Sequence, residues 1–142
     1  MPEENTRQIE ESCIVMLDFG KVESAAKSGK PVMPAVIQHA DTKDVLMVGY
    51  MSREALEETI STRRVTFWST SRSELWRKGE SSGNRFVVDS IFVNCEQNSL
   101  LVKARPEKGG VCHTLNKQTR NRATCYYRKL EDMERLTFDG MD

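Results

Sequence analysis

The chain has 142 residues, of which 38% are hydrophobic and 30% are charged, and its 21 basic side chains balance its 21 acidic ones. This size and composition fit one domain with a hydrophobic core, and the zero net charge excludes a global attraction to nucleic acid or an anionic membrane. No apolar run approaches the roughly 20 residues of a membrane span, and residues 1–11 are polar and acidic, unlike a signal peptide. We therefore expect a cytoplasmic protein.

Residues 1–31 are expected to form an N-terminal extension that is helical or flexible. Charged side chains dominate residues 1–12, and apolar residues recur there on no clear period. Residues 19–27 have a short helical pattern that ends at Ser28-Gly29-Lys30-Pro31, because glycine favours a helix C-terminus and proline cannot continue a helix. The main domain is expected over residues 32–130, with a C-terminal tail over residues 131–142.

The next part of the chain predicts a β-hairpin followed by one amphipathic helix. Val32–His39 and Val45–Met51 are apolar and β-branched, and five polar residues connect them. Ser52 is a suitable N-cap for a helix over residues 53–60. The reciprocal capping box is incomplete, because Ala55 stands where it requires Glu or Gln.

Further strands are expected at residues 65–69, 86–95, 100–104 and 123–130, with the second and third of these as antiparallel neighbours. The predicted fold class is therefore α+β with predominantly antiparallel or mixed β structure. We expect a folded sheet or pseudo-barrel with a β-hairpin and one or two short helices.

Cysteines give the strongest indication of chemistry in this sequence. Four cysteines in a cytosolic protein favour metal binding or catalysis over disulfides. Cys95, Cys112 and Cys125 are candidate zinc ligands, with His113 beside the second of them. Three protein ligands leave one tetrahedral position open to water, as in catalytic zinc sites. Cys13 has no partner motif and is expected to be unrelated to metal binding.

The segment from residue 68 to residue 84 is rich in serine, glycine and cationic side chains and contains both tryptophans. Glycines let backbone amides approach an anion, hydroxyl and cationic groups complete a phosphate site, and aromatic faces stack on flat heterocycles. The same composition fits a solvated loop whose tryptophans pack in the core. The candidate substrate contacts are Trp68, Arg72, Trp76, Lys78, Ser81, Ser82 and Gly83.

Several motifs follow one another in a fixed order between about residue 32 and residue 128. They are Trp68-Ser69-x-Ser71-Arg72, Leu75-Trp76-Arg77-Lys78-Gly79-Glu80-x-Ser82-Gly83-Asn84, Cys95, Cys112-His113-Thr114 and Cys125-Tyr126-Tyr127-Arg128. In this order they resemble the phosphoribosyl-AMP cyclohydrolase family of histidine biosynthesis. The predicted hairpin and helix are similar to the opening of that family.

The resemblance implies a hydrolase that opens the purine ring of 1-(5-phosphoribosyl)-AMP between N1 and C6, giving the phosphoribosylformimino imidazole carboxamide ribotide. It also implies zinc, magnesium and an intertwined homodimer in which the zinc ligands Cys95, Cys112 and Cys125 come from both subunits. Because three thiolates make zinc a weaker Lewis acid, a nearby base is valuable, and we expect His113 to act as acid and base. Lys78 is expected to bind phosphate or to stabilise charge on the heterocycle.

One departure from the family pattern concerns magnesium. The family places three carboxylates around its first cysteine, whereas this chain has Asn94, Glu96 and Asn98 around Cys95. Magnesium prefers anionic oxygen ligands, so we expect only a weakened magnesium site at these three residues.

A second departure is the spacing of twelve residues between Cys112 and Cys125, where the family has about six. Lengthening a loop costs about 0.6 kcal/mol for each doubling, so both cysteines are still expected to reach one metal ion. Arg120 and Arg122 are expected on the solvated face of this extended loop.

Two alternatives are compatible with the sequence. One is a small binding module in which the three cysteines and His113 close a structural zinc site and the basic residues 117–122 contact nucleic acid. Missing C-x-x-C pairs and the balanced charge weigh against it. The other alternative keeps the fold and loses the activity through the altered magnesium residues.

Overall fold

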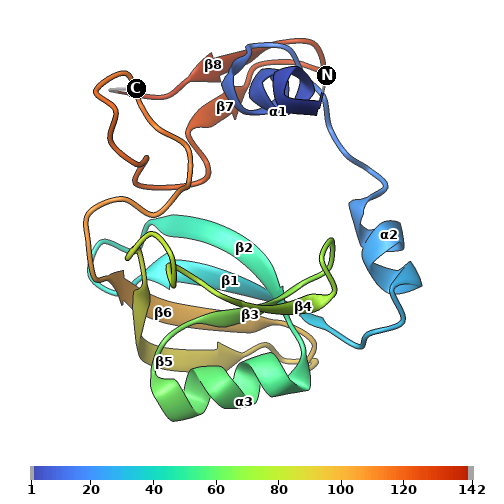
Figure 1. Cartoon of the computed structure of the whole chain (residues 1–142), viewed down its shortest axis with the longest axis vertical. Helices are drawn as coiled ribbons and strands as arrows, with labels where there is room; N and C mark the ends of the chain where they lie inside the picture. Colours follow the sequence, from blue (N-terminus) through green and yellow to red (C-terminus); the bar gives the residue numbers. More distant parts are fainter. Residues whose placement is uncertain (1, 141–142) are drawn as a thin grey trace.

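The computed structural model describes the backbone of residues 2–140 and the side chains of residues 7–140. Over this range the chain forms three helices and eight strands (Figure 1). In chain order they are α1 (Pro2–Glu11), α2 (Lys21–Lys27), β1 (Met33–His39), β2 (Val45–Met51), α3 (Arg53–Thr62), β3 (Thr66–Ser69), β4 (Glu74–Arg77), β5 (Phe86–Val93), β6 (Leu100–Pro106), β7 (Arg128–Leu130) and β8 (Leu136–Phe138).

A four-stranded sheet in the order β2-β1-β6-β5 forms the centre of the fold. Strand β1 pairs antiparallel with β2 and parallel with β6, and β5 pairs antiparallel with β6. This arrangement confirms an α+β fold with mixed, mainly antiparallel strand pairing. The sheet is open, with β2 and β5 at its edges. Of the two predicted alternatives, a folded sheet or a pseudo-barrel, the described residues therefore do not form the pseudo-barrel.

The hydrophobic core lies on one face of this sheet because apolar side chains alternate along its strands. Ala35 and Ile37 of β1 are buried there beside Leu100 and Val102 of β6. Helix α3 and the hairpin β3–β4 contribute to the same core, the hairpin through Phe67. Strand β4 thus belongs to the domain core, although the sequence indicated only a loop for its residues.

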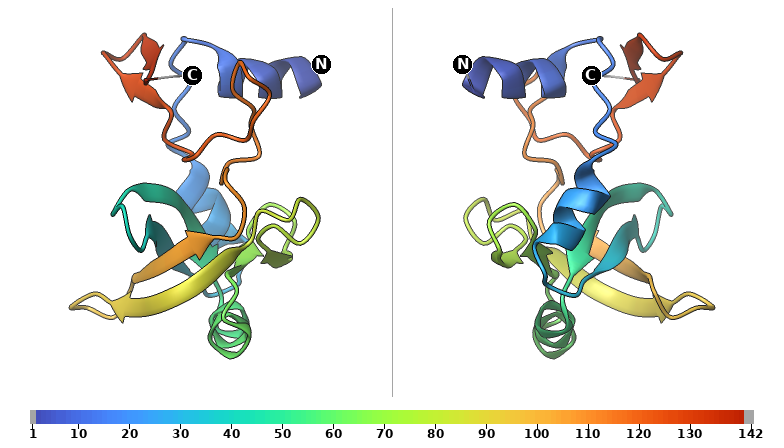
Figure 2. Two further views of the ribbon diagram at one scale, coloured as in Figure 1. Left: turned by 90° about the vertical axis from the view of Figure 1, so that its left-hand side faces the viewer. Right: turned by 90° about the vertical axis from the view of Figure 1, so that its right-hand side faces the viewer.

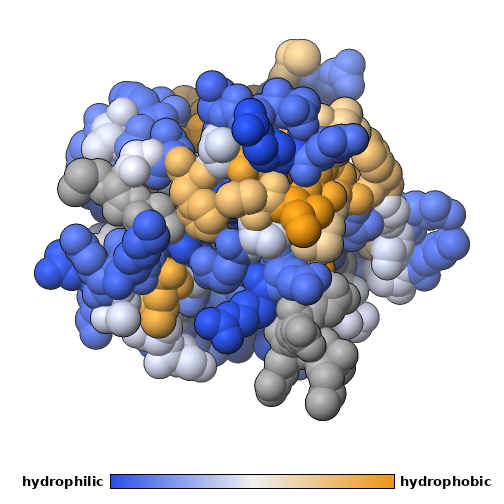
Figure 3. All heavy atoms as spheres, turned by 90° about the horizontal axis from the view of Figure 1, so that it is seen from above, coloured by the Kyte–Doolittle hydropathy of each residue, from blue (hydrophilic) through white to orange (hydrophobic). Residues whose placement is uncertain are grey.

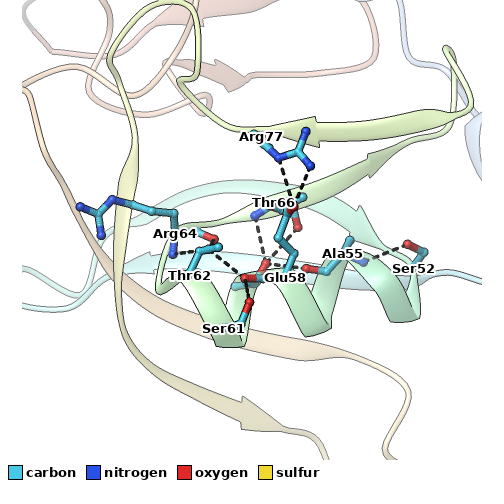
Figure 4. A network of polar contacts seen from close by, with 9 residues as sticks. Ser52, Ala55, Glu58, Ser61, Thr62, Arg64, Thr66 and Arg77 are labelled. Carbon is cyan, nitrogen blue, oxygen red and sulfur yellow. Dashed lines mark hydrogen bonds and ion pairs between the residues drawn. The ribbon is translucent and has the colours of Figure 1, made fainter.

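Glu58 joins helix α3 to the hairpin β3–β4 through one carboxylate (Figure 4). Thr66 donates its hydroxyl to Glu58 at 2.7 Å, and Arg77 Nη2 lies 2.7 Å from the other carboxylate oxygen. The hydrogen bonds from Arg77 and then Thr66 hold the pKa of Glu58 below its usual value. The position of β4, and of Lys78 that follows it, is therefore fixed relative to α3.

The sequence located the first hairpin and helix well. The observed β2 has the predicted bounds, β1 begins one residue later than predicted, and Ser52 caps α3 by accepting from Ala55 N at 3.2 Å. The predicted strand at residues 123–130 is wrong over most of its length, since only its last three residues form a strand, β7. The preceding residues dock on the sheet instead, where Cys125 N donates to Leu46 O at 2.9 Å.

The two ends of the chain form a layer beside the sheet, made of α1 and the hairpin β7–β8 (Figure 1). Val15 N donates to Glu134 O at 3.1 Å, and Leu136 N donates to Cys13 O at 2.8 Å. Seen from this side, the surface carries an apolar area among hydrophilic side chains (Figure 3). None of the helices described is long and apolar enough to cross a membrane.

The packing of the core can be tested by a substitution at Gly49. A Cβ at this position would lie 2.6 Å from the ring of Phe67, which is buried. We predict that Gly49→Ala lowers the free energy of unfolding by about 1–3 kcal/mol, as overpacking does, measured by urea denaturation. Gly109→Ala is the matched control, because its Cβ would have no atom within 4 Å. Equal stability of the two variants would contradict this packing.

Candidate active site around a cysteine pair

Cys112 and Cys125 are neighbours in the folded chain. The side chains of Cys125 and Cys112 interact, and this interaction lowers the pKa of Cys112 and raises the pKa of Cys125. Burial adds to the raised pKa of Cys125, while the hydroxyl of Thr114, 3.0 Å from Cys112 Sγ, helps to lower the pKa of Cys112. Cys112 is therefore the thiolate of the pair.

Hydrogen bonds between the two arms of the intervening loop bring the cysteines together. The carbonyl of Arg122 accepts from the N–H groups of Val111 and Cys112, both at 2.9 Å. The side chain of Asn121 donates to Cys112 O at 2.9 Å. Gly110 permits this approach, because a Cβ there would lie 2.3 Å from Asn121 O.

The extra length of the loop is confined to a turn of its own. Asn116 N donates to Arg120 O, Thr119 N donates to Asn116 O, and a β-bridge joins Leu115 to Asn121. Residues 115–120 thus form a small loop that is closed by its own hydrogen bonds. Cys112 and Cys125 therefore lie near each other although twelve residues separate them, and their binding of one metal ion stays a prediction.

Lys78 lies beside the cysteine pair and is only 8% exposed. Its Nζ donates to Val111 O at 2.7 Å, one residue before Cys112. Burial lowers the pKa of Lys78, and the negative charge of the cysteine pair acts in the opposite direction. The turn after Lys78 is held by Gly79, whose φ of +80° suits glycine and whose carbonyl accepts from Gly83 N at 2.8 Å. A desolvated ammonium therefore stands next to a thiolate.

His113 is on the outer side of this segment. Its side chain is 77% exposed, whereas that of Cys112 is buried. The imidazole Nε2 lies 2.7 Å from Glu10 Oε1 on helix α1. Nothing in the sequence indicated this contact, because the two residues are 103 positions apart.

Cys95 lies at the opposite end of the sheet, in the turn between β5 and β6. Strand β6 (Leu100–Pro106) begins after this turn and leads at its other end to the segment that carries Cys112. Figure 2 shows this turn projecting from the rest of the chain. Within residues 2–140 of one copy, no three His, Cys, Asp or Glu side chains are grouped to hold a metal ion. One copy thus brings together two of the three predicted zinc ligands.

The three predicted magnesium residues are bonded to one another in the β5–β6 turn. Asn94 Nδ2 donates to Asn98 Oδ1 at 2.6 Å, and Asn98 Nδ2 donates to Glu96 Oε2 at 3.0 Å. Asn94 Oδ1 accepts from the backbone N–H groups of Asn98 and Ser99 at 2.8 and 2.9 Å. These oxygens are engaged in closing the turn, so this arrangement does not fit a magnesium site.

The predicted substrate contacts fall into two groups. Ser81, Ser82 and Gly83 lie in the turn after Lys78, where a Cβ at Gly83 would be 2.9 Å from Lys108 Nζ. Lys108 is a cation near this turn that the sequence did not single out. Arg72 lies at the other end of the hairpin β3–β4, where its Nε is 3.4 Å from Ser69 Oγ.

The two tryptophans differ in their surroundings. Trp76 packs on Phe67, with ring centroids 5.4 Å apart, and so contributes to the core. Trp68 lies under the ammonium of Lys30, 4.9 Å from the ring centroid. In the part of the chain that the structure describes, the buried indole Nε1 of Trp68 has no hydrogen-bond partner.

Arg122 is not on the solvated surface, and that prediction is wrong. Its guanidinium is buried and forms two hydrogen bonds of 2.9 Å with the carboxylate of Glu11. It also lies 4.0 Å from the ring centroid of Tyr127. The pattern of the loop suggested exposure because its neighbours are polar, whereas the burial comes from helix α1, far away in the sequence.

Comparisons with known proteins show the family of the chain. A family model described as phosphoribosyl-AMP cyclohydrolase matches residues 47–127, which include Lys78 and all three candidate zinc cysteines. A protein of that name from Bordetella pertussis is 45% identical over 100 residues, covering 70% of each chain. Those from Clavibacter sepedonicus and Bifidobacterium adolescentis are 52% and 51% identical over 83 and 85 residues, covering 58% and 60% of this chain and 59% and 62% of theirs.

The fold, the cysteine pair and these relatives define the chain as a hydrolytic enzyme rather than a nucleic-acid-binding module. It belongs to the phosphoribosyl-AMP cyclohydrolase family of histidine biosynthesis.

The β5–β6 turn can be tested by restoring carboxylates. We predict that the double variant N94D/N98D binds Mn²⁺ at least about 10-fold more tightly than the wild type, because two carboxylates supply charge that amides lack. Electron paramagnetic resonance titration of the zinc-loaded proteins measures the free Mn²⁺. Equal affinity of the two proteins would contradict the argument that the amides at these positions weaken metal binding.

Proposed function

We propose that this enzyme hydrolyses 1-(5-phosphoribosyl)-AMP at a zinc site shared by two copies of the chain. In this reaction a water oxygen forms a bond to purine C6, the N1–C6 bond breaks, and N1 takes up a proton. The product is the phosphoribosylformimino imidazole carboxamide ribotide. The observation that supports this proposal most directly is the pair formed by the buried Cys112 and the exposed Cys125, with Lys78 beside it, inside the segment matched by the family model.

Cys112 and Cys125 have the chemistry that zinc requires. Zinc binds thiolates, and the lowered pKa of Cys112 already provides one at neutral pH. Cys95 of a second copy would complete a set of three ligands and leave one position open. When bound, zinc lowers the pKa of a coordinated water toward about 7 and so supplies hydroxide at neutral pH.

The other roles belong to residues of the chain. We assign His113 as the base that takes the proton of the water and returns it to N1. Lys78, desolvated beside the pair, stabilises the negative charge that develops on the heterocycle. Substrate contacts are assigned to Trp68, Arg72, Trp76, Ser81, Ser82 and Gly83.

Exposed apolar side chains support the participation of a second copy. Phe92 and Val93, at the end of β5 that leads to Cys95, are 49% and 53% exposed. Val45 and Val48 of β2 are exposed as well, close to Leu46, on which Cys125 docks. Burying such side chains against another copy is favourable and would bring Cys95 toward a cysteine pair.

A turnover assay with variants tests the assigned roles. We predict that Cys112→Ala abolishes both stoichiometric zinc and turnover of phosphoribosyl-AMP, followed by absorbance of the imidazole product. His113→Ala is expected to keep zinc and lose at least about 100-fold in kcat, as expected for an acid–base residue. Full turnover by the histidine variant would reject its role, and no turnover by the zinc-loaded wild type would reject the function.

Mixing two inactive variants tests the shared site. A dimer of one Cys95→Ala chain and one Cys112→Ala chain has one site without either change. Random exchange of subunits is therefore expected to restore about one quarter of wild-type activity, since half of the dimers are mixed and each has one intact site. Each variant incubated without the other is the control. Absence of recovery, with subunit exchange verified by mass spectrometry, would place all zinc ligands in one copy.

A further inference from the structure

We propose that Glu10 on helix α1 is a positioning residue, which holds the imidazole of His113 in one orientation and one tautomer for ring opening. This inference rests on the acid–base role proposed above for His113. The observation behind it is the 2.7 Å contact between Glu10 Oε1 and His113 Nε2. Glu10 lies outside the segment of residues 47–127 that the family model matches.

The backbone of Glu10 is fixed by the segment that follows Cys125. The hydroxyl of Tyr127 donates to the carbonyl of Glu10 at 2.8 Å. Two residues farther along the chain, the carbonyl of Ser12 accepts from Arg128 Nη1 at 2.9 Å. Both contacts tie the end of α1 to the same stretch of chain that positions one half of the cysteine pair.

The side chain next to Glu10 adds a third anchor. Glu11 forms two hydrogen bonds with the buried guanidinium of Arg122, whose carbonyl accepts from the backbone of Cys112. A bidentate pair of this kind, with its guanidinium buried, holds both partners in a narrow range of geometries. These contacts hold the backbone at the end of α1 in place, and the carboxylate of Glu10 is therefore kept close to His113.

His113 needs such support because its side chain is 77% exposed. An exposed imidazole samples several rotamers and both neutral tautomers. A carboxylate accepting from Nε2–H selects one orientation and places the hydrogen on Nε2. The Nδ1 lone pair is then free to accept the proton of the attacking water.

Imidazole nitrogen chemical shifts report the tautomer directly. In zinc-loaded protein labelled with ¹⁵N-histidine, we expect the Nε2–H tautomer at His113 in the wild type and a mixture of tautomers in Glu10→Ala. His39 is the internal reference, because its Nδ1 accepts from Asp41 N at 3.1 Å and is far from α1 in sequence. Unchanged His113 shifts in Glu10→Ala would overturn the proposal whatever the activity.

A double-mutant cycle separates positioning from a general effect on structure. We expect Glu10→Ala to lower kcat about 10-fold with KM within about twofold, and to have no further effect when His113 is already Ala. Glu10→Gln keeps an acceptor oxygen and is expected to retain kcat within about threefold. Arg7→Ala, an exposed change on the same helix, is the matched control with wild-type kcat.

The two proposals fail in different ways. A 10-fold loss from Glu10→Ala that persists in the His113→Ala background would show that Glu10 acts elsewhere and would overturn its positioning role. Wild-type kcat in His113→Ala would instead reject the base assigned under the proposed function, and with it the catalytic purpose of the contact.

Discussion

The candidate site depends on one return of the chain, at which the carbonyl of Arg122 accepts from the backbones of Val111 and Cys112. Without this return the two thiols would belong to separate parts of a loop. The return also links the pair to the sheet, because Cys125 N donates to Leu46 O and Lys78 donates to Val111 O. The reactive groups are therefore supported by strands rather than by a mobile loop, as an enzyme site requires.

Much of the fold could be predicted because it follows from local pattern. The hairpin β1–β2, helix α3 and the pair β5–β6 have clear periodicity and bounded turns, and each appears close to its predicted range. Strands β4 and β8 have four and three residues, too few for a periodic pattern to be recognised, so they were not predicted. The parallel pairing of β1 with β6 joins segments that no turn connects, which is why only the class of the sheet was predictable.

The site was predictable to the extent that its chemistry is carried by rare residue types. Cysteines and their motif order indicated Cys112 and Cys125, and the structure places them in contact. Arg122 could not be recognised, because its burial depends on Glu11 and on the ring of Tyr127 rather than on its neighbours. Glu10 was missed for the same reason, since a helix at the start of the chain supplies it across 103 positions.

The turn between β5 and β6 illustrates how one structural role can be filled by different chemistry. Three carboxylates at these positions would repel one another unless a cation were bound. The side chains of Asn94 and Asn98 instead form hydrogen bonds with each other and with Glu96. Neutral amides thus give the turn an internal set of hydrogen bonds. The cysteine carried by this turn is presented by a loop that is closed by its own side chains.

The strand order has a consequence for how the molecule assembles. Strand β1 meets β2 after a short turn, but its other edge is filled only by β6, where Ala35 pairs with Leu100. Contacts between such distant segments form slowly, because a long loop must close first. During synthesis, the edge of β1 that pairs with β6 therefore stays unpaired until residues 100–106 have left the ribosome. The segment that carries Cys112 and Cys125 comes later still, so the cysteine pair cannot form until most of the chain has been synthesised.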